Sequence, residues 1–329
     1  MSVAFLTEMG FEGKVPSDHT NMRTEFAWMH ALNADHYCIY RSESFTKVKN
    51  YDAVYMIFPK GNLFLNSVGA KLVSGITPTS NLLKLDIVNL LKQQGNQKVF
   101  YIQEGPHWLW NDYEIEDQVN KYNLVSMCDG IFAHNESDAR YYRGLFPSVD
   151  VKVIPTLLIE TLISSIQPNP QDKVIIGGNF ARWYGGFESY IVATEFNLPI
   201  WAQTSHAMRE REELMDNLTH LPRLSWIDWM KELSTFRYAV HLMPTVAAGT
   251  FSLNCAYFGI PTIGNIDVDT QRLCHPMLSV DVNDVDTARK LARKLHEDVE
   301  FYNDCSTIAK EQYKVHFSLD KFNSTMKVL

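Results

Sequence analysis

Two glycines close an apolar run near the middle of the chain. The run at 174–176 is followed by Gly177 and Gly178, and Arg182 stands close behind them. Glycines let backbone amides approach a phosphate closely, and a guanidinium group offers two parallel donors to phosphate oxygens. The spacing is neither G-x-G-x-x-G nor a Walker loop, so a plain strand-to-helix turn with a surface arginine is the alternative interpretation. The segment is therefore a candidate phosphate site.

A loop of small residues precedes a short predicted helix in the second half of the chain. Gly249 and Thr250 lead through Phe251 into Ser252, and the helix ends at Gly259. The N-terminus of a helix behind such a loop binds anions, because its first amides have no partner within the helix. The hydroxyls of Thr250 and Ser252 could add donors there, although an ordinary helix–strand connection explains the same residues.

Candidate acid–base and stacking groups follow the apolar run at 99–103. Glu104 could act as a general base, and His107 is the alternative base. A solvated carboxylate and an exposed neutral histidine are the simpler interpretations of these two residues. Trp108 and Trp110 could form a stacking platform for a sugar or a nucleobase, or could pack in the core.

Metal and disulfide chemistry are not expected. Asp267 and Asp269 form a D-x-D pattern, which can hold a divalent cation beneath a diphosphate, but this one follows a late predicted strand. The five cysteines are far apart and show neither a C-x-x-C pair nor a cysteine–histidine ligand spacing.

Length and composition favour a soluble two-domain protein. The 329 residues are long for one compact domain, and the 46% hydrophobic content allows each half its own core. The formal net charge of -8 argues against a surface that coats nucleic acid, but leaves a local basic groove open. No segment reaches the roughly 18 apolar residues of a membrane span, so we expect no membrane contact and a cytoplasmic location, the host cytoplasm if the chain is viral.

Short apolar runs alternate with amphipathic stretches along the chain, which indicates parallel strands joined by helices. In the first half the expected strands are 3–6, 37–40, 53–58, 99–103, 130–133 and 151–154, and the expected helices are 21–32, 80–93, 113–127 and 136–145. The polar stretch 167–172 contains Pro168 and Pro170 and is the expected linker. After it the expected strands are 173–177, 198–203, 238–243 and 262–264, and the expected helices are 186–196, 207–217, 226–236, 252–258, 286–296 and much of 299–329.

The second half resembles the donor domain of GT-B glycosyltransferases. The resemblance rests on three segments that occur in the same order as in that family, over residues 173–310. They are Gly177–Arg182, Trp226-Ile227-Asp228, and the helix that ends in Gly259-Ile260-Pro261-Thr262. Asn254 stands where this family usually places a ribose-binding glutamate, and Val246 stands where retaining members often carry another.

Within that fold the chain is most similar to phage DNA glucosyltransferases of the β-glucosyl type, which modify hydroxymethylcytosine. The likeness includes Val15-Pro16-Ser17 with Thr20, the segment 175–182, and the strand 99–103, after which those enzymes carry a catalytic carboxylate. Glu104 occupies the matching place. The resemblance implies an α/β fold of two Rossmann-like domains facing a central cleft, with an acceptor-side domain at 1–166, a nucleotide-sugar domain at 173–310, and a C-terminal helix at 311–329 that could pack back on the first domain.

The resemblance also implies a hexosyl- or pentosyltransferase whose co-substrate is a nucleotide sugar, most simply a UDP-sugar, with no tightly bound cofactor and no metal. The expected acceptor is a hydroxymethylated base in double-stranded DNA. A protein, a glycan or a small molecule is the alternative acceptor, and a non-catalytic two-lobed nucleotide-sugar-binding protein is the alternative function. The expected catalytic residues are Glu104 and His107, the acceptor-binding residues are Lys14, Trp108 and Trp110, and the donor-binding residues are Gly13, Gly177, Gly178, Arg182, Ile227, Gly249, Thr250, Phe251, Ser252 and Asn254.

Overall fold

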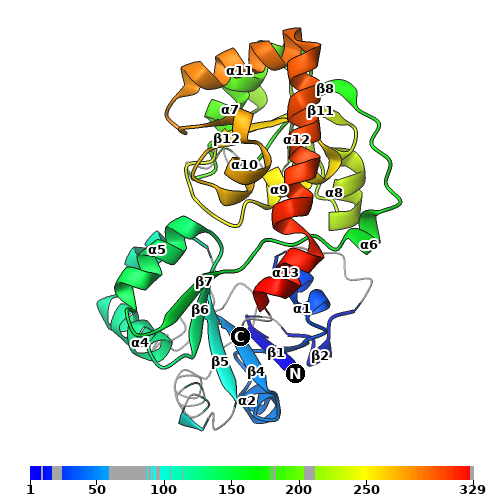
Figure 1. Ribbon diagram of the computed structural model, residues 1–329. Helices are drawn as coiled ribbons and strands as arrows, with labels where there is room; N and C mark the ends of the chain where they lie inside the picture. Colours follow the sequence, from blue (N-terminus) through cyan, green and yellow to red (C-terminus); the bar gives the residue numbers. More distant parts are fainter. Residues whose placement is uncertain are drawn as a thin grey trace. The chain divides into compact units, whose positions relative to one another are not determined.

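The chain forms two compact units (Figure 1). Unit 1 comprises Met1–His19 and Glu25–Ile154, and unit 2 comprises Thr20–Thr24 and Pro155–Leu329. The structure is a computed structural model. It describes residues 1–8, 10–16, 24–58, 87, 90, 92–93, 97–103, 105–112, 114–178, 180, 183–203 and 212–326. Among these residues no helix is both long enough and apolar enough to cross a membrane.

The described part of unit 1 contains a seven-stranded sheet in the order β2-β3-β1-β4-β5-β6-β7. The short β2 is antiparallel to β3, and the other pairs are parallel. The strands are β1 (Val3–Thr7), β2 (Gly13–Lys14), β3 (Asp35–Cys38), β4 (Ala53–Ile57), β5 (Lys98–Ile102), β6 (Gly130–Ala133) and β7 (Asp150–Val153). Every residue of β1 and β4 is buried, as expected for parallel strands covered on both faces.

Helices connect these strands. They are α1 (Glu25–Ala31), α2 (Ser42–Val48), the 3₁₀ helix η1 (His107–Asp112), α4 (Ile115–Val125) and α5 (Glu136–Leu145). The predicted N-cap of α5 is confirmed, since the side chain of Asn135 accepts a hydrogen bond of 2.8 Å from the amide of Asp138. Most of the predicted helix 80–93 lies outside the described residues.

The described part of unit 2 contains a six-stranded, fully parallel sheet in the order β10-β9-β8-β11-β12-β13. Counted along the chain this is the order 3-2-1-4-5-6 of the doubly wound Rossmann fold. The strands are β8 (Gln171–Ile176), β9 (Ile200–Gln203), β10 (Leu218–Leu221), β11 (Phe236–His241), β12 (Thr262–Asn265) and β13 (Ser279–Val280). The predicted α/β class with two Rossmann-like domains is confirmed.

Unit 2 also contains helices. They are α6 (Glu160–Ile163), α7 (Gly186–Ala193), α8 (Trp226–Leu233), α9 (Thr250–Phe258), α10 (Asp269–Cys274), α11 (Val285–Glu297), α12 (Val299–Phe317) and α13 (Leu319–Met326), with 3₁₀ turns η2 (Thr194–Phe196), η3 (Glu212–Leu214) and η4 (Pro276–Leu278). Helix α11 buries Ala288, Ala292 and Leu295, which recur at helical spacing on one face.

The first strand of unit 2 begins inside the polar stretch that the sequence marks as a linker. The amide of Gln171 donates to the carbonyl of Thr235 at 2.8 Å, and Asp172 pairs with Arg237 at 2.7 Å. These bonds extend β8 and also start β11 at Phe236, so the helix predicted to reach residue 236 ends at Leu233. Residues 155–166 belong to unit 2. That 311–329 packs back on the first domain stays a prediction.

Candidate functional site

The carboxyl ends of β8 and β11 form the switch point of the unit 2 sheet. The two strands are neighbours, and the chain leaves them in opposite directions, toward β9 after β8 and toward β12 after β11. Ligands of open α/β sheets bind outside the carboxyl ends of the strands at such a point. Gly177 directly follows β8, and its amide donates to the carbonyl of Val240 at 2.9 Å.

The half-buried imidazole of His241 connects the two strand ends to the start of α9. A Cβ atom on Gly177 would lie 2.5 Å from Cγ and 2.7 Å from Cδ2 of His241, so only glycine fits there. The ring of His241 also meets the ring of Phe251 edge-on, with centroids 4.9 Å apart. The structure therefore brings together Gly177 and Phe251, two residues that the sequence predicts for the donor site.

The sequence prediction missed His241. Its Nε2 is buried and has no hydrogen-bond partner among the described residues. Burial lowers the pKa of His241 to about 4, so the ring is neutral near pH 7. A polar residue in the last position of an apolar strand was the available signal, and such positions face the ligand in this fold.

Two helices begin at this edge without a side-chain cap. Helix α7 follows Gly185 (φ 64°) and α9 follows Gly249 (φ 67°), and neither N-cap side chain bonds the first turn. A Cβ on Gly185 would overlap the carbonyl oxygen of Leu242, and one on Gly249 would overlap Oγ1 of Thr270. Close packing thus demands glycine at both caps. Among the described residues no N-cap side chain accepts a hydrogen bond from the first-turn amides of α7 or α9, so these amides are available to bind an anion.

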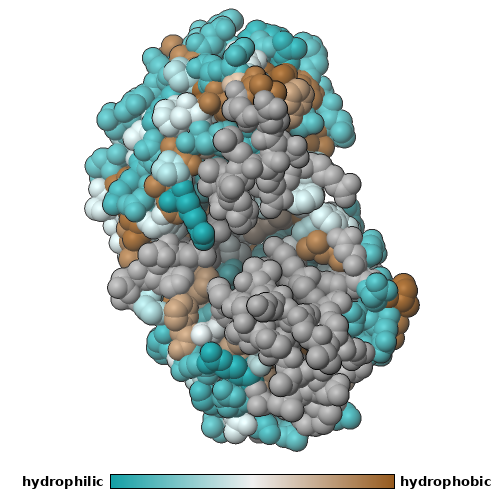
Figure 2. All heavy atoms as spheres, turned by 180° about the vertical axis from the view of Figure 1, so that it is seen from behind, coloured by the Kyte–Doolittle hydropathy of each residue, from teal (hydrophilic) through white to brown (hydrophobic). Residues whose placement is uncertain are grey.

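Exposed aromatic side chains accompany the glycine turn. Trp183 is 40%, Tyr184 36% and Phe187 58% exposed, and a Cβ on Gly178 (φ 75°) would lie 3.0 Å from Cβ of Tyr184. On the face that Figure 2 shows, hydrophobic patches are scattered among hydrophilic residues. Exposed aromatic rings offer surfaces on which a sugar or a base can stack.

Two predicted donor-binding side chains hold α9 in place. The buried hydroxyl of Ser252 donates to Oε1 of Gln271 at 2.9 Å. The amide of Asn254, oriented to satisfy both neighbours, accepts from Nε1 of Trp229 at 3.1 Å and donates to the carbonyl of Thr250 at 3.2 Å. These bonds hold α9 against its neighbours, and direct contact of Ser252 and Asn254 with a donor stays a prediction.

Ile227 and Thr250 lie at the starts of α8 and α9. Ile227 is half-buried in the first turn of α8, which the side chain of Ser225 caps by accepting from the amide of Asp228. Thr250 is the first residue of α9 and is also half-buried. Arg182, predicted to face the phosphate, lies outside the described residues.

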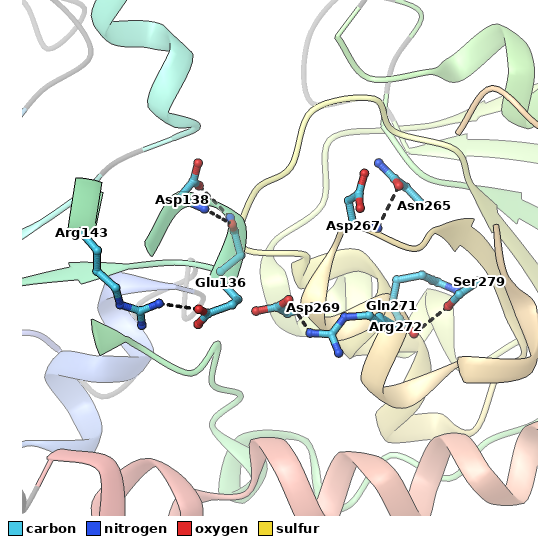
Figure 3. A network of polar contacts seen from close by, with 10 residues as sticks. Glu136, Asp138, Arg143, Asn265, Asp267, Asp269, Gln271, Arg272 and Ser279 are labelled. Carbon is cyan, nitrogen blue, oxygen red and sulfur yellow. Dashed lines mark hydrogen bonds and ion pairs between the residues drawn. The ribbon is translucent and has the colours of Figure 1, made fainter. Parts of the chain in front are cut away.

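The D-x-D pattern at the start of α10 makes local structural bonds (Figure 3). The amide of Asp267 donates to Oδ1 of Asn265 at 3.0 Å, and Asp269 forms an ion pair with Arg272 at 2.9 Å. In the part of the chain that the structure describes, no group of three or more histidine, cysteine, aspartate or glutamate residues could hold a metal ion.

Burial of His275 makes the stability of unit 2 depend on pH. Its Nε2 donates to the carbonyl of Ser252 at 3.0 Å, and burial lowers its pKa to about 4. An unfolded histidine titrates near 6.5, so on acidification the unfolded chain binds a proton before the folded one. The contribution of His275 to the free energy of unfolding is therefore fully present above about pH 6.5. It falls by about 3 kcal/mol as the pH is lowered to about 4.

Urea unfolding at about pH 7 and about pH 5 measures this loss. The wild type should lose about 2 kcal/mol between the two conditions through His275, and His275→Gln should lose less. His30→Gln, which changes an exposed histidine of α1, should keep the wild-type dependence. Equal losses in wild type and His275→Gln would contradict this account.

In unit 1, η1 carries His107, Trp108 and Trp110. Nδ1 of His107 lies 2.6 Å from Oδ1 of Asp138, and the imidazole stacks on Tyr141 with centroids 4.4 Å apart. Trp108 is half-buried. Trp110 is 6% exposed and belongs to the hydrophobic core, as the alternative interpretation of core packing expects, and its role in binding the acceptor stays a prediction. Glu104 lies outside the described residues.

Gly13 and Lys14 form β2 at the edge of the unit 1 sheet. Gly13 has open space where a Cβ would stand. Lys14 lies 3.4 Å from the carboxylate of Asp35 and donates to the carbonyl of Asn33 at 2.5 Å, so its ammonium group is held on the neighbouring strand.

The topology of the two sheets defines a class, namely α/β proteins built of two units with Rossmann-like sheets. No family model matches the chain, and no curated protein matches its sequence. Solved structures do match it along its whole length. An alpha-glucosyltransferase in complex with UDP and a 13-mer DNA containing an HMU base has a TM-score of 0.67 and 11% identity, covering 100% of this chain and 99% of that one.

Two further neighbours do not carry DNA in their names. Sucrose-phosphate synthase from Thermosynechococcus elongatus has a TM-score of 0.65 and 11% identity, covering 100% of this chain and 98% of that one. Anabaena HepE in complex with UDP and glucose has a TM-score of 0.65 and 10% identity, with the same coverage. The chain thus has the GT-B fold, and its resemblance to GT-B glycosyltransferases is confirmed at that level. The DNA-bound neighbour is an alpha enzyme, whereas the sequence resembles the β-glucosyl type.

Proposed function

We propose that the chain is a glycosyltransferase whose donor is a nucleoside diphosphate sugar, most simply a UDP-sugar, bound at the carboxyl edge of unit 2. The observation that carries the proposal is the convergence of Gly177, the neutral ring of His241 and the uncapped start of α9 at the switch point. A diphosphate is the ligand that such amides and helix dipoles favour. The UDP bound in the structural neighbours supports the same donor.

The leaving diphosphate explains why this chemistry needs such an edge. As the bond from the anomeric carbon to the phosphate oxygen breaks, negative charge grows on that oxygen. The amides of α7 and α9 stabilise that charge without rearrangement, because the glycine caps fix them in advance. Arg182 is proposed to add a guanidinium to the same phosphates.

We further propose that the acceptor is the hydroxymethyl group of a modified base in double-stranded DNA. The sequence resemblance to DNA glucosyltransferases and the DNA-bound neighbours support this acceptor. The target base must leave the helical stack to expose its hydroxyl, and Trp108, half-buried on η1, is the proposed stacking surface for it. Glycan or small-molecule acceptors are the second candidate, favoured by the neighbours with sucrose-phosphate and HepE names and by the net charge of -8.

Transfer assays distinguish these acceptors. Purified protein should move labelled sugar from UDP-glucose or another UDP-sugar to duplex DNA containing hydroxymethylcytosine, and not to the same duplex with cytosine. Its affinity for duplex DNA should fall steeply with added salt. Transfer to sugar phosphates with no measurable DNA binding at low salt would replace DNA by the second acceptor class. UDP-sugar binding with no transfer to any acceptor would indicate a non-catalytic binding protein.

A further inference from the structure

A buried carboxylate holds the imidazole of His107 in unit 1. Oδ1 of Asp138 lies 2.6 Å from Nδ1 of His107 and also accepts from the backbone amide of His107 at 3.1 Å. The side chain of Asp138 is 1% exposed, whereas that of His107 is 34% exposed. The imidazole therefore bridges a buried anion and the surface of unit 1.

The carboxylate is itself fixed by the start of α5. The other oxygen of Asp138, Oδ2, accepts from Nδ2 of Asn135 at 2.7 Å, and the amide of Asp138 donates to Oδ1 of Asn135 at 2.8 Å. With both oxygens bonded, the carboxylate can rotate only by breaking its hydrogen bonds to Asn135 and His107. Tyr141, one turn further along α5, stacks on the imidazole and fixes its plane.

This geometry selects one tautomer of His107. A carboxylate only accepts hydrogen bonds, so Nδ1 must carry a proton, and in the neutral ring Nε2 then carries a lone pair. A proton taken up at Nε2 gives an imidazolium that the buried carboxylate stabilises. The arrangement is that of a base positioned to remove a proton from a hydroxyl group.

We propose that His107 is the base of the transfer reaction and that Asp138 is its positioning residue. The inference rests on the proposed function and deepens it by assigning the proton. Nε2 takes the proton of the acceptor hydroxyl, the acceptor oxygen forms a bond to the anomeric carbon, and the bond to the donor phosphate breaks. The nucleoside diphosphate leaves with that electron pair. Because one displacement occurs with the aid of one base, the configuration of the anomeric carbon inverts.

Glu104 is the competing base, three residues before His107 in the sequence. Four variants separate the possibilities. His107→Gln and His107→Ala remove the base, Asp138→Asn removes the charge behind it, and Glu104→Gln tests the competitor. Glu136→Gln is the matched control, since this carboxylate of α5 is exposed and forms an ion pair with the surface residue Arg143.

The expected kcat loss is about 10²- to 10⁴-fold for both His107 variants, with little change in the KM for the donor. Imidazole added to the solution should restore part of the His107→Ala rate, which a purely structural role would not allow. Asp138→Asn should lower kcat by about 10- to 100-fold with little change in the KM for the donor, because the imidazole is no longer held in one orientation. The product, followed by NMR, should have the inverted anomeric configuration.

Any one of three results would overturn the inference. The first is a near-normal kcat in His107→Gln together with an inactive Glu104→Gln. The second is the absence of imidazole rescue in His107→Ala, and the third is a product of retained configuration. In each of these cases the wild type still transfers sugar, so the proposed function stands. Absence of any transfer by the wild type overturns both. Melting curves and UDP binding of each variant identify any that fail to fold. If Asp138→Asn fails to fold, the rescue of His107→Ala by imidazole still tests whether His107 is the base.

Discussion

Replacing Gly177 by alanine is expected to remove most of the affinity for a UDP-sugar. The new methyl group would lie 2.5 Å from Cγ of His241, so either the imidazole or the end of β8 must move. A shift of about 1 Å at a phosphate-binding turn is enough to misplace its amides, and we expect at least about a 100-fold weaker Kd. Calorimetric titration of UDP into wild type and Gly177→Ala measures the loss.

The cause can be checked by a double substitution. If the imidazole is what the methyl group meets, His241→Ala combined with Gly177→Ala should bind UDP better than Gly177→Ala alone, a non-additivity typical of residues in contact. Melting temperatures without ligand separate weak binding from unfolding. Gly144→Ala, at a position with no atom within 4 Å of the new methyl group, should bind as the wild type does. Additive effects of the two substitutions would contradict the contact.

Replacing Gly185 by alanine should cause the largest loss of folding stability. Its Cβ would overlap the carbonyl oxygen of Leu242, which is backbone and cannot turn aside as a side chain could. The residue also has a φ of 64°, which residues with a Cβ adopt at a cost. Together the two effects should remove about 3 kcal/mol from the free energy of unfolding of unit 2.

Urea unfolding of Gly185→Ala tests this expectation. The same chemical change at Gly144, within α5, should be neutral or should stabilise unit 1 by up to about 1 kcal/mol, since alanine favours a helix more than glycine. If glycine-to-alanine substitution lowers the free energy of unfolding at Gly185 and raises it at Gly144, then packing around the cap of α7, and not the loss of a glycine as such, controls stability. A loss below about 1 kcal/mol in Gly185→Ala would show that the start of α7 can move away from β11.

The alternation of apolar runs and helices was sufficient to predict the α/β class. The run at 174–176 and the helix at 136–145 with its Asn135 cap appear where expected, because buried parallel strands are continuously apolar and caps are local. The strand β10 was missed because Leu218–Leu221 is only four residues long and places two polar residues, Thr219 and His220, between its leucines, so no polar–apolar alternation marks it. Short edge strands owe their conformation to the neighbouring strand, which a local pattern does not contain.

The candidate site was predictable only in part for the same reason. Glycines before the start of a helix are a local pattern that predicts an anion site. Gly177 and Phe251 do lie against the same side chain, that of His241. Which polar side chains remain available is a tertiary property. Ser252 and Asn254 have residue types suited to binding a donor, yet helix packing commits both to internal hydrogen bonds. Asp138 lay unnoticed because its partner His107 is 31 residues away in the sequence.

The account depends most on the claim that backbone amides at the switch point of unit 2 bind a nucleoside diphosphate. Two-dimensional ¹H–¹⁵N spectra of the isotope-labelled protein, recorded while UDP is added, test it residue by residue. The amides of Gly177 and Gly178 and those of the first turns of α7 and α9 should shift first and saturate together. Saturable shifts confined to unit 1, or no shift at all at millimolar UDP, would contradict the account.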